Sequence, residues 1–99
     1  MHKIVCELQI NDERVLVMMD DIQENLYKVN MDTNKVTKYD DREALDDFLN
    51  DYLKADTAIF DKDFYNPTLN YAFDNLGNDE MYKQAYECLR NQENITIVF

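Results

Sequence analysis

The sequence is poor in the residues that many active sites and most flexible linkers require. Its 99 residues include one glycine, one proline and one histidine. The single glycine, Gly77, excludes both the dinucleotide-binding fingerprint and the phosphate-binding P-loop, because each needs several glycines at fixed spacing. The histidine is the second residue of the chain, where it is not held firmly enough to act as a general base. These absences argue against an enzyme.

Cysteines and long apolar runs are also scarce. Cys6 and Cys88 are too few for a disulfide framework, and we expect both to be buried free thiols. Glu7 interrupts the first apolar segment before it could form a signal peptide or a membrane span. The Asp-Lys-Asp segment at 61–63 begins like a calcium loop, but Asn66 stands where that loop needs glycine. We therefore expect a cytoplasmic protein without a metal, a cofactor or a membrane partner.

Alternating apolar residues predict two β-hairpins in the first part of the chain. Residues 4–19 alternate around a tight turn at 11–13, and residues 26–39 do so around a four-residue turn at 32–35. Asparagine and aspartate in these turns tolerate the left-handed backbone that hairpin loops commonly need. A three- or four-stranded antiparallel meander is the expected result.

Three helices are predicted in the second part. Asp40 is expected to cap the first helix, with Glu43 reaching back to it, and apolar residues within 45–53 recur with helical spacing. The second helix is expected to begin at Asn66, directly before the proline, and the third at Asn78.

Two short apolar segments complete the prediction. Residues 57–60 indicate a connector or short strand, and residues 95–99 a final strand that returns to the sheet. The chain is expected to form one α+β domain over residues 1–99, with an antiparallel sheet of four to five strands and about three helices on one face. The other face is expected to be partly apolar, with Val5, Leu16 and Met18 on it, which favours either a monomer with a partner surface or a homodimer.

Negative charge is the feature that the sequence has in excess. Twenty-one acidic residues stand against ten basic ones, which gives a formal net charge of −11. Such a field attracts basic surfaces and repels nucleic acid and membrane phosphates. The expected partner is therefore a basic protein, with no direct contact to nucleic acid.

The acidic residues are densest in and around the first predicted helix. Carboxylates spaced four residues apart rise by about 6 Å per step along a helix and could imitate a row of DNA phosphates. Asp47 and Asp51 are expected to face solvent. The predicted partner-binding residues are Asp40, Asp41, Glu43, Asp46, Asp47, Asp51, Asp20, Asp21 and Glu24. Asp61 and Asp63 could extend this surface. No residue is predicted to be catalytic.

In size, in its lack of catalytic motifs and in its carboxylate density from Asp40 to Asp56, the chain resembles small acidic inhibitors encoded by phages, including anti-CRISPR and anti-restriction DNA mimics. This resemblance implies a stoichiometric inhibitor in a bacterial host cell that occupies the basic cleft of a CRISPR effector such as Cas9. Three alternatives stay open: an immunity or antitoxin-like protein that masks a basic nuclease toxin, a small self-associating scaffold, and a domain whose acidity has no function.

Overall fold

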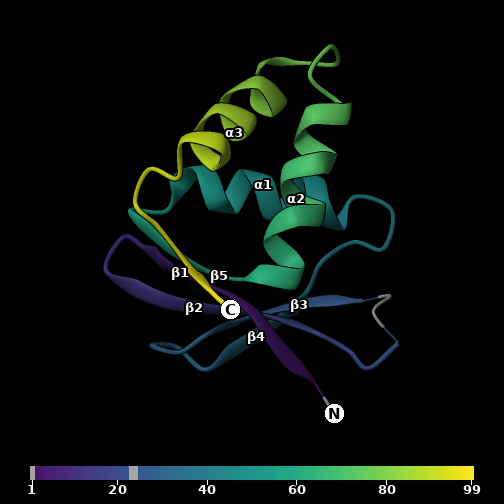
Figure 1. Ribbon diagram of the computed structural model, residues 1–99. Coiled ribbons are helices and arrows are strands. Elements are labelled where there is room, and N and C mark those ends of the chain that lie inside the picture. The colour runs from purple at the N-terminus through teal and green to yellow at the C-terminus, as the bar shows by residue number, and fades with distance from the viewer. Residues whose placement is uncertain (1, 23–24) are drawn as a thin grey trace.

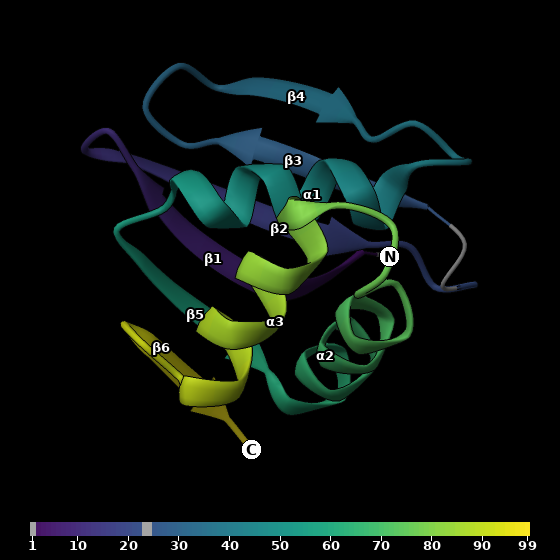
Figure 2. The ribbon, with the colours of Figure 1, turned by 90° about the horizontal axis from the view of Figure 1, so that it is seen from above.

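The computed structural model describes residues 2–22 and 25–99 and arranges their helices and strands in two layers (Figures 1 and 2). The three helices lie together over one face of a single sheet. In chain order the elements are β1 (Lys3–Ile10), β2 (Glu13–Met19), β3 (Leu26–Asn30), β4 (Lys35–Lys38), α1 (Ala44–Lys54), β5 (Thr57–Asp61), α2 (Lys62–Asp74), α3 (Glu80–Asn91) and β6 (Ile95–Val98).

Both predicted hairpins are present, and their turns have the expected chemistry. Asn11 and Asp12 form the two-residue loop between β1 and β2, with φ angles of 51° and 65°. Positive φ at both positions is the type I′ geometry that matches the twist of the flanking strands. Asn30 pairs with Lys35 across the second hairpin, so its four-residue loop spans 31–34, one residue earlier than expected, and Asn34 at φ 60° closes it.

The sheet confirms the predicted α+β class and corrects two details of it. It has six strands in the order β4-β3-β2-β1-β5-β6, one more than the largest number expected. β5 and β6 pair in parallel, whereas every other pair of neighbours is antiparallel. Parallel neighbours need a long crossover, and α2 with α3 supplies it. The segment at 57–60 is a short strand, the second of the two expected alternatives, and lies inside the sheet between β1 and β6.

Helix α1 begins later than expected. Asp40 accepts a hydrogen bond from the backbone N–H of Arg42 at 2.9 Å, within the turn that precedes the helix. Glu43 occupies the N-cap position and makes no side-chain capping bond, so the predicted reciprocal cap is wrong. The predicted apolar stripe is correct: Phe48 and Leu49 are fully buried.

Helices α2 and α3 are both capped by aspartates. Asp61 accepts from the N–H of Asp63 at 2.8 Å, so α2 begins four residues before the expected asparagine cap and contains Pro67. A proline close to a helix start removes a single intrahelical hydrogen bond, which this helix tolerates. Asp79 accepts from the N–H of Met81 at 2.8 Å, one residue later than expected.

The core lies between the sheet and the helices. Phe48 of α1 contacts Phe60 of β5 and Phe64 of α2 in edge-on geometry, with ring centroids 6.0 and 5.1 Å apart. A β-bulge between Ile4 and Cys6 shifts the alternation of β1, so that Val5 is buried and does not lie on the open face as expected. The bulge thereby supplies an apolar side chain to the site described below.

The opposite face of the sheet carries no helix and is partly apolar, as the sequence predicts. Register places Leu16 of β2, Val29 of β3 and Val36 of β4 in one row across adjacent strands. Ile59 of β5 lies on the same face, 39% exposed. Among the described residues, no helix is both long and apolar enough to cross a membrane.

Candidate functional site

A pocket of about 560 Å³ opens where the starts of α1 and α2 meet one end of the sheet. Its volume lies within the range of about 300–1,000 Å³ that is common for ligand sites. Six elements, β1, β2, β3, β5, α1 and α2, contribute to its wall or border it. The apolar part of the lining consists of Val5, Met19, Leu26, Ala44, Leu45, Phe64, Pro67 and Tyr71.

Carboxylates from three separate segments line the same pocket. They are Asp20, Asp21, Asp41, Asp61 and Asp63. Two basic residues, Lys3 and Arg42, lie among them. The end of β2, the turn before α1 and the start of α2 therefore converge on one place. The helix dipole accounts for part of this convergence, because carboxylates are favoured near helix N-termini.

The contacts around this rim are those of a solvent-exposed surface. The Lys3 ammonium lies 3.4 Å from a carboxylate oxygen of Asp61 and 3.9 Å from one of Asp63, whose side chain is 84% exposed. Lys38 pairs with Asp41 at 2.9 Å, and this hydrogen bond raises the pKa of Lys38. The two exposed pairs, Lys3 with Asp63 and Lys38 with Asp41, contribute little to stability, about 0–1 kcal/mol. The Asp61 side chain is less accessible, at 27% exposed.

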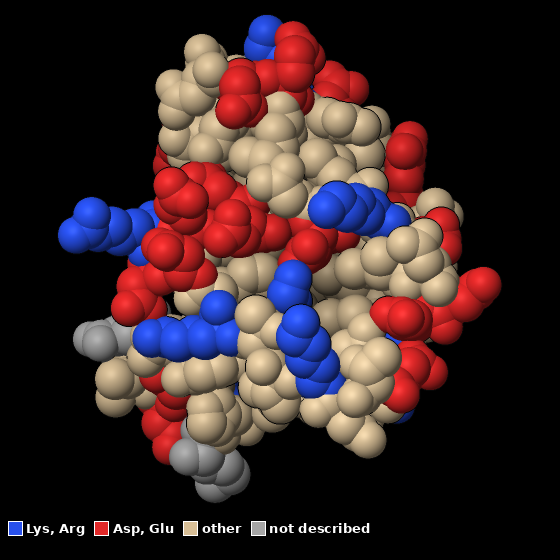
Figure 3. Space-filling view, turned by 180° about the vertical axis from the view of Figure 1, so that it is seen from behind, with Lys and Arg blue, Asp and Glu red and all other residues tan. Residues whose placement is uncertain are grey.

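Charge is distributed unevenly over the side of the molecule opposite to that in Figure 1. Figure 3 shows a cluster of Asp and Glu at mid-height on this side, with a group of Lys and Arg directly below it and further Asp and Glu along the right edge. The separation means that the net charge of −11 is not spread evenly.

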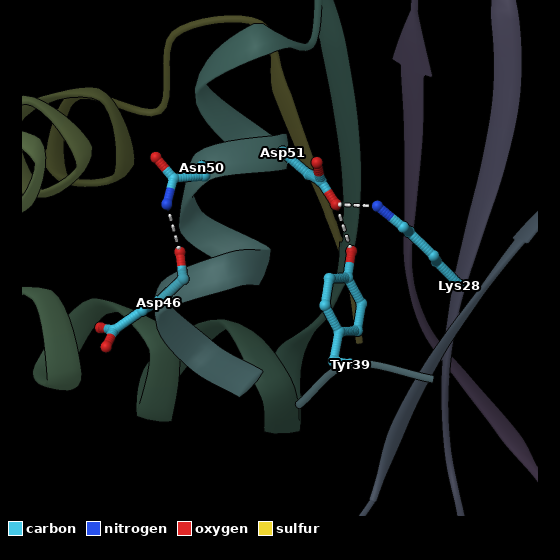
Figure 4. A network of polar contacts seen from close by, with 5 residues as sticks. All are labelled: Lys28, Tyr39, Asp46, Asn50 and Asp51. Carbon is cyan, nitrogen blue, oxygen red and sulfur yellow. Dashed lines mark hydrogen bonds and ion pairs between the residues drawn. The ribbon is translucent and has the colours of Figure 1, made fainter. Parts of the chain in front are cut away.

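Asp51, in the second half of α1, has a structural role that the sequence does not reveal. Its carboxylate accepts from the Tyr39 hydroxyl at 2.7 Å and from the Lys28 ammonium at 2.9 Å (Figure 4). The Asp51 side chain is only 16% exposed. Burial, and next the hydrogen bond to Asp51, raise the pKa of Tyr39. The network ties α1 to the β3–β4 hairpin.

Asp46 ties α1 to the other two helices. Figure 4 shows its carboxylate pointing away from the Asp51 network. One carboxylate oxygen accepts from the Tyr71 hydroxyl of α2 at 2.8 Å and from the Tyr82 hydroxyl of α3 at 2.5 Å. The hydrogen bond to Asp46 raises the pKa of Tyr82, as burial also does. Because Tyr71 lines the pocket, Asp46 supports the pocket wall from behind.

The structure thus divides the predicted partner-binding residues. Those that line the pocket are Asp20, Asp21 and Asp41. Those that lie near the start of α1, outside the pocket lining, are Asp40, Glu43 and Asp47. The expectation that Asp51 faces solvent is wrong, because Tyr39 and Lys28 cover it. Glu24 lies outside the described residues.

Several parts of the pocket have no counterpart in the sequence analysis. Lys3, Arg42 and Tyr71 are not predicted there, and Asp61 and Asp63 are expected only as an extension of unknown position. A capping pattern at 61–63, aspartate two residues before aspartate at a helix start, is the local signal that could have placed the last two. The apolar floor has no local signal, because it joins residues from distant elements.

Other chemistry is limited in the part of the chain that the structure describes. No group of three or more His, Cys, Asp and Glu side chains there could hold a metal ion.

The histidine and the two cysteines show no sign of an activated group. His2 is exposed and contacts the Tyr27 ring edge-on, with ring centroids 5.1 Å apart. Cys6 is a buried free thiol, and burial raises its pKa above the ordinary range, which makes it a poor nucleophile. Cys88 is also free and is half-buried.

Comparison of the chain with known protein families, with curated proteins and with solved structures finds no match.

Proposed function

We propose that this protein is a stoichiometric inhibitor that binds a basic, nucleic-acid-binding protein through the acidic pocket. The observation that carries the proposal is the convergence of five aspartates from three segments around one pocket with an apolar floor. A surface with this composition can inhibit without catalysis, because a protein bound in a nucleic-acid cleft prevents the partner protein from binding nucleic acid there.

The two parts of the pocket support different aspects of binding. Long-range attraction between the acidic rim and a basic cleft speeds association, and salt weakens it. The apolar floor slows dissociation, because buried apolar contacts at the centre of an interface dominate its affinity. The floor also distinguishes this surface from a uniformly acidic one, which would bind basic proteins without selection.

The most specific form of the proposal follows from the resemblance to phage-encoded inhibitors. The partner is then a CRISPR effector such as Cas9, and the protein competes with target DNA for the effector's basic cleft. A nuclease toxin masked by an immunity protein would present similar chemistry. The experiment below separates these partners by identity.

The test is a capture experiment with the tagged protein, run at about 100 mM and about 500 mM salt, where the Debye length falls from ~10 Å to a few Å. Purified Cas9 and a bacterial lysate are the two sources of partner, and captured proteins are identified by mass spectrometry. We expect capture of a basic nucleic-acid enzyme at low salt, its loss at high salt, and inhibition of that enzyme at a 1:1 ratio.

A matched control separates the pocket from net charge. Asp41→Asn with Asp63→Asn removes two charges from the pocket, and Glu80→Gln with Glu87→Gln removes two from exposed positions on α3. We expect only the first pair to weaken capture. Equal weakening by both pairs would show that binding depends on net charge and not on the pocket. If neither Cas9 nor any basic nucleic-acid enzyme from the lysate is captured, the proposal is wrong. Added target DNA that displaces Cas9 would identify competition as the mode of inhibition.

A further inference from the structure

The pocket has the chemistry of a receptor for one long, amphipathic cation. We propose that it receives the side chain of a single arginine that the basic partner presents, with the alkyl stem on the floor and the guanidinium at the acidic rim. This inference rests on the proposed function and deepens it, because it names the group that occupies the site.

The floor fits the stem of such a side chain. Val5 and Leu26 come from the sheet, and Leu45 and Phe64 come from the first turns of α1 and α2. Val5, Leu26 and Phe64 are 4–6% exposed, so they form a fixed surface and do not need to rearrange. Arginine places a three-carbon stem on apolar surface while its charged head stays near water. A cation without a stem, such as a metal ion, would leave this surface unused.

The rim fits a guanidinium better than an ammonium. Asp41 belongs to the segment before α1, whereas Asp61 and Asp63 belong to the start of α2, so acceptors approach from more than one side. A guanidinium has five N–H donors in a planar fork and can serve carboxylates on several sides, whereas an ammonium has three donors around one point. The ring of Tyr71, which also lines the pocket, adds a surface on which a guanidinium can stack.

Lys3 occupies part of this position in the free protein. Its ammonium lies 3.4 Å from Asp61 and 3.9 Å from Asp63, and its side chain is 58% exposed. The contact to Asp63 is long and exposed and therefore weak, and the contact to Asp61, whose side chain is 27% exposed, is longer than a hydrogen bond between charged groups. An incoming guanidinium competes with Lys3 for the same carboxylates, so removal of the Lys3 charge is expected to strengthen binding. A non-specific effect of net charge would also strengthen binding, but it would do so equally for arginine and lysine.

The pocket volume of about 560 Å³ exceeds what one side chain needs. The arginine therefore enters together with its flanking backbone, as the tip of a loop or the end of a helix would present it. Blocked single amino acids carry this backbone and are suitable probes.

The experiment is an NMR titration of the full chain with N-acetyl-arginine methylamide, with its lysine analogue, and with its neutral isostere, the citrulline analogue. Methyl signals of Val5, Leu26 and Leu45 report on the floor. We expect the arginine probe to shift these signals, to bind at least threefold more tightly than the lysine probe, and to lose binding when citrulline replaces arginine. Equal binding of arginine and lysine, or shifts scattered over the surface, would overturn the proposal.

Three variants make the test specific to the pocket. Asp63→Asn should weaken the arginine probe at least threefold, and Lys3→Met should strengthen it about threefold while increasing the preference over lysine. Glu87→Gln, an exposed change of the same size on α3, should leave it unchanged. If the arginine probe fails while the protein still captures its partner in a salt-dependent way, this inference is wrong and the proposed function stands. If neither binds, both fail.

Discussion

The carboxylates at the two ends of helix α1 look alike in the sequence and are used in opposite ways. Before the helix, Asp41 has a 65% exposed side chain on the pocket rim and pairs with a surface lysine. Near its end, Asp51 is 16% exposed and holds the Tyr39 hydroxyl and the Lys28 ammonium. The comparison teaches that local density of acidic residues does not indicate how many of them are available to a partner.

The two groups also differ in their energetics. A half-buried carboxylate has lost part of its hydration, so its partners must replace the lost hydrogen bonds, and removing it leaves them unsatisfied. An exposed carboxylate keeps its hydration and can change partners freely. Substitution is therefore expected to change stability at Asp46 and Asp51, and to change binding at Asp41 and Asp63.

Charge reversal at Asp51 should break this comparison most strongly. Asp51→Lys places a second ammonium beside Lys28 and leaves the Tyr39 hydroxyl without its acceptor. We expect the free energy of unfolding to fall by about 3 kcal/mol, measured by denaturant titration with circular dichroism. Asp63→Lys, at a side chain 84% exposed, should cost less than about 1 kcal/mol. Equal losses would mean that the two carboxylates are not used differently.

Reversing the charge of two carboxylates on the pocket rim should have the second largest effect, a loss of affinity for the partner. Asp41→Lys combined with Asp63→Lys is expected to weaken the complex with the captured nucleic-acid enzyme about a hundredfold, or about 2.7 kcal/mol, measured by calorimetry at about 100 mM salt. Glu80→Lys combined with Glu87→Lys makes the same change in net charge on α3 and should weaken it less than tenfold. An equal loss with both pairs would assign binding to net charge and not to the pocket.

Removal of Asp46 should have an intermediate effect on stability. Asp46→Ala leaves two tyrosine hydroxyls without their acceptor, and we expect a loss of about 2 kcal/mol in the free energy of unfolding. Asp46→Asn retains an acceptor oxygen and should cost about 1 kcal/mol. Glu43→Ala, at an exposed residue that makes no capping bond, should change stability by less than about 0.5 kcal/mol. A larger loss at Glu43 than at Asp46 would contradict this order.

The smallest expected effect is a loss of stability at alkaline pH, which depends on the contact between Tyr39 and Asp51. Burial and the hydrogen bond to Asp51 raise the pKa of Tyr39 above its ordinary value of about 10. The folded state therefore keeps this proton while the unfolded state loses it, so stability is complete below pH ~10 and falls as pH rises above it. At pH ~11, one unit above the ordinary pKa, we expect Tyr39 to have lowered the free energy of unfolding by about 1.4 kcal/mol.

Tyr39→Phe provides the matching measurement. Unfolding followed from pH 8 to pH 11 should show a shallower decline in the variant, whatever its stability at neutral pH. An identical slope in the two proteins would show that the Tyr39 hydroxyl does not remain protonated through its contact with Asp51.

Most of the secondary structure could be predicted, and the errors have local causes. Both hairpins and the apolar stripe of α1 follow from periodicity and turn chemistry, which act over a few residues. The predicted start of α2 is too late because proline favours the first helical position, whereas Asp61 provides the actual cap, five residues before the expected cap Asn66. The burial of Val5 was missed because a β-bulge changes the alternation, and no local pattern marks it.

The sequence by itself determined the α+β class, the two hairpins and the excess of negative charge, because each follows from composition or from spacing along a single segment. Only the tertiary structure decided which carboxylates are available. It directs Asp46 and Asp51 to hydroxyl groups on other elements, and it gathers Asp20, Asp41 and Asp63 around one pocket. The physical reason is that these residues are far apart in the sequence. Packing brings them together across strands and helices, so the residue pattern within any one segment cannot predict their contacts.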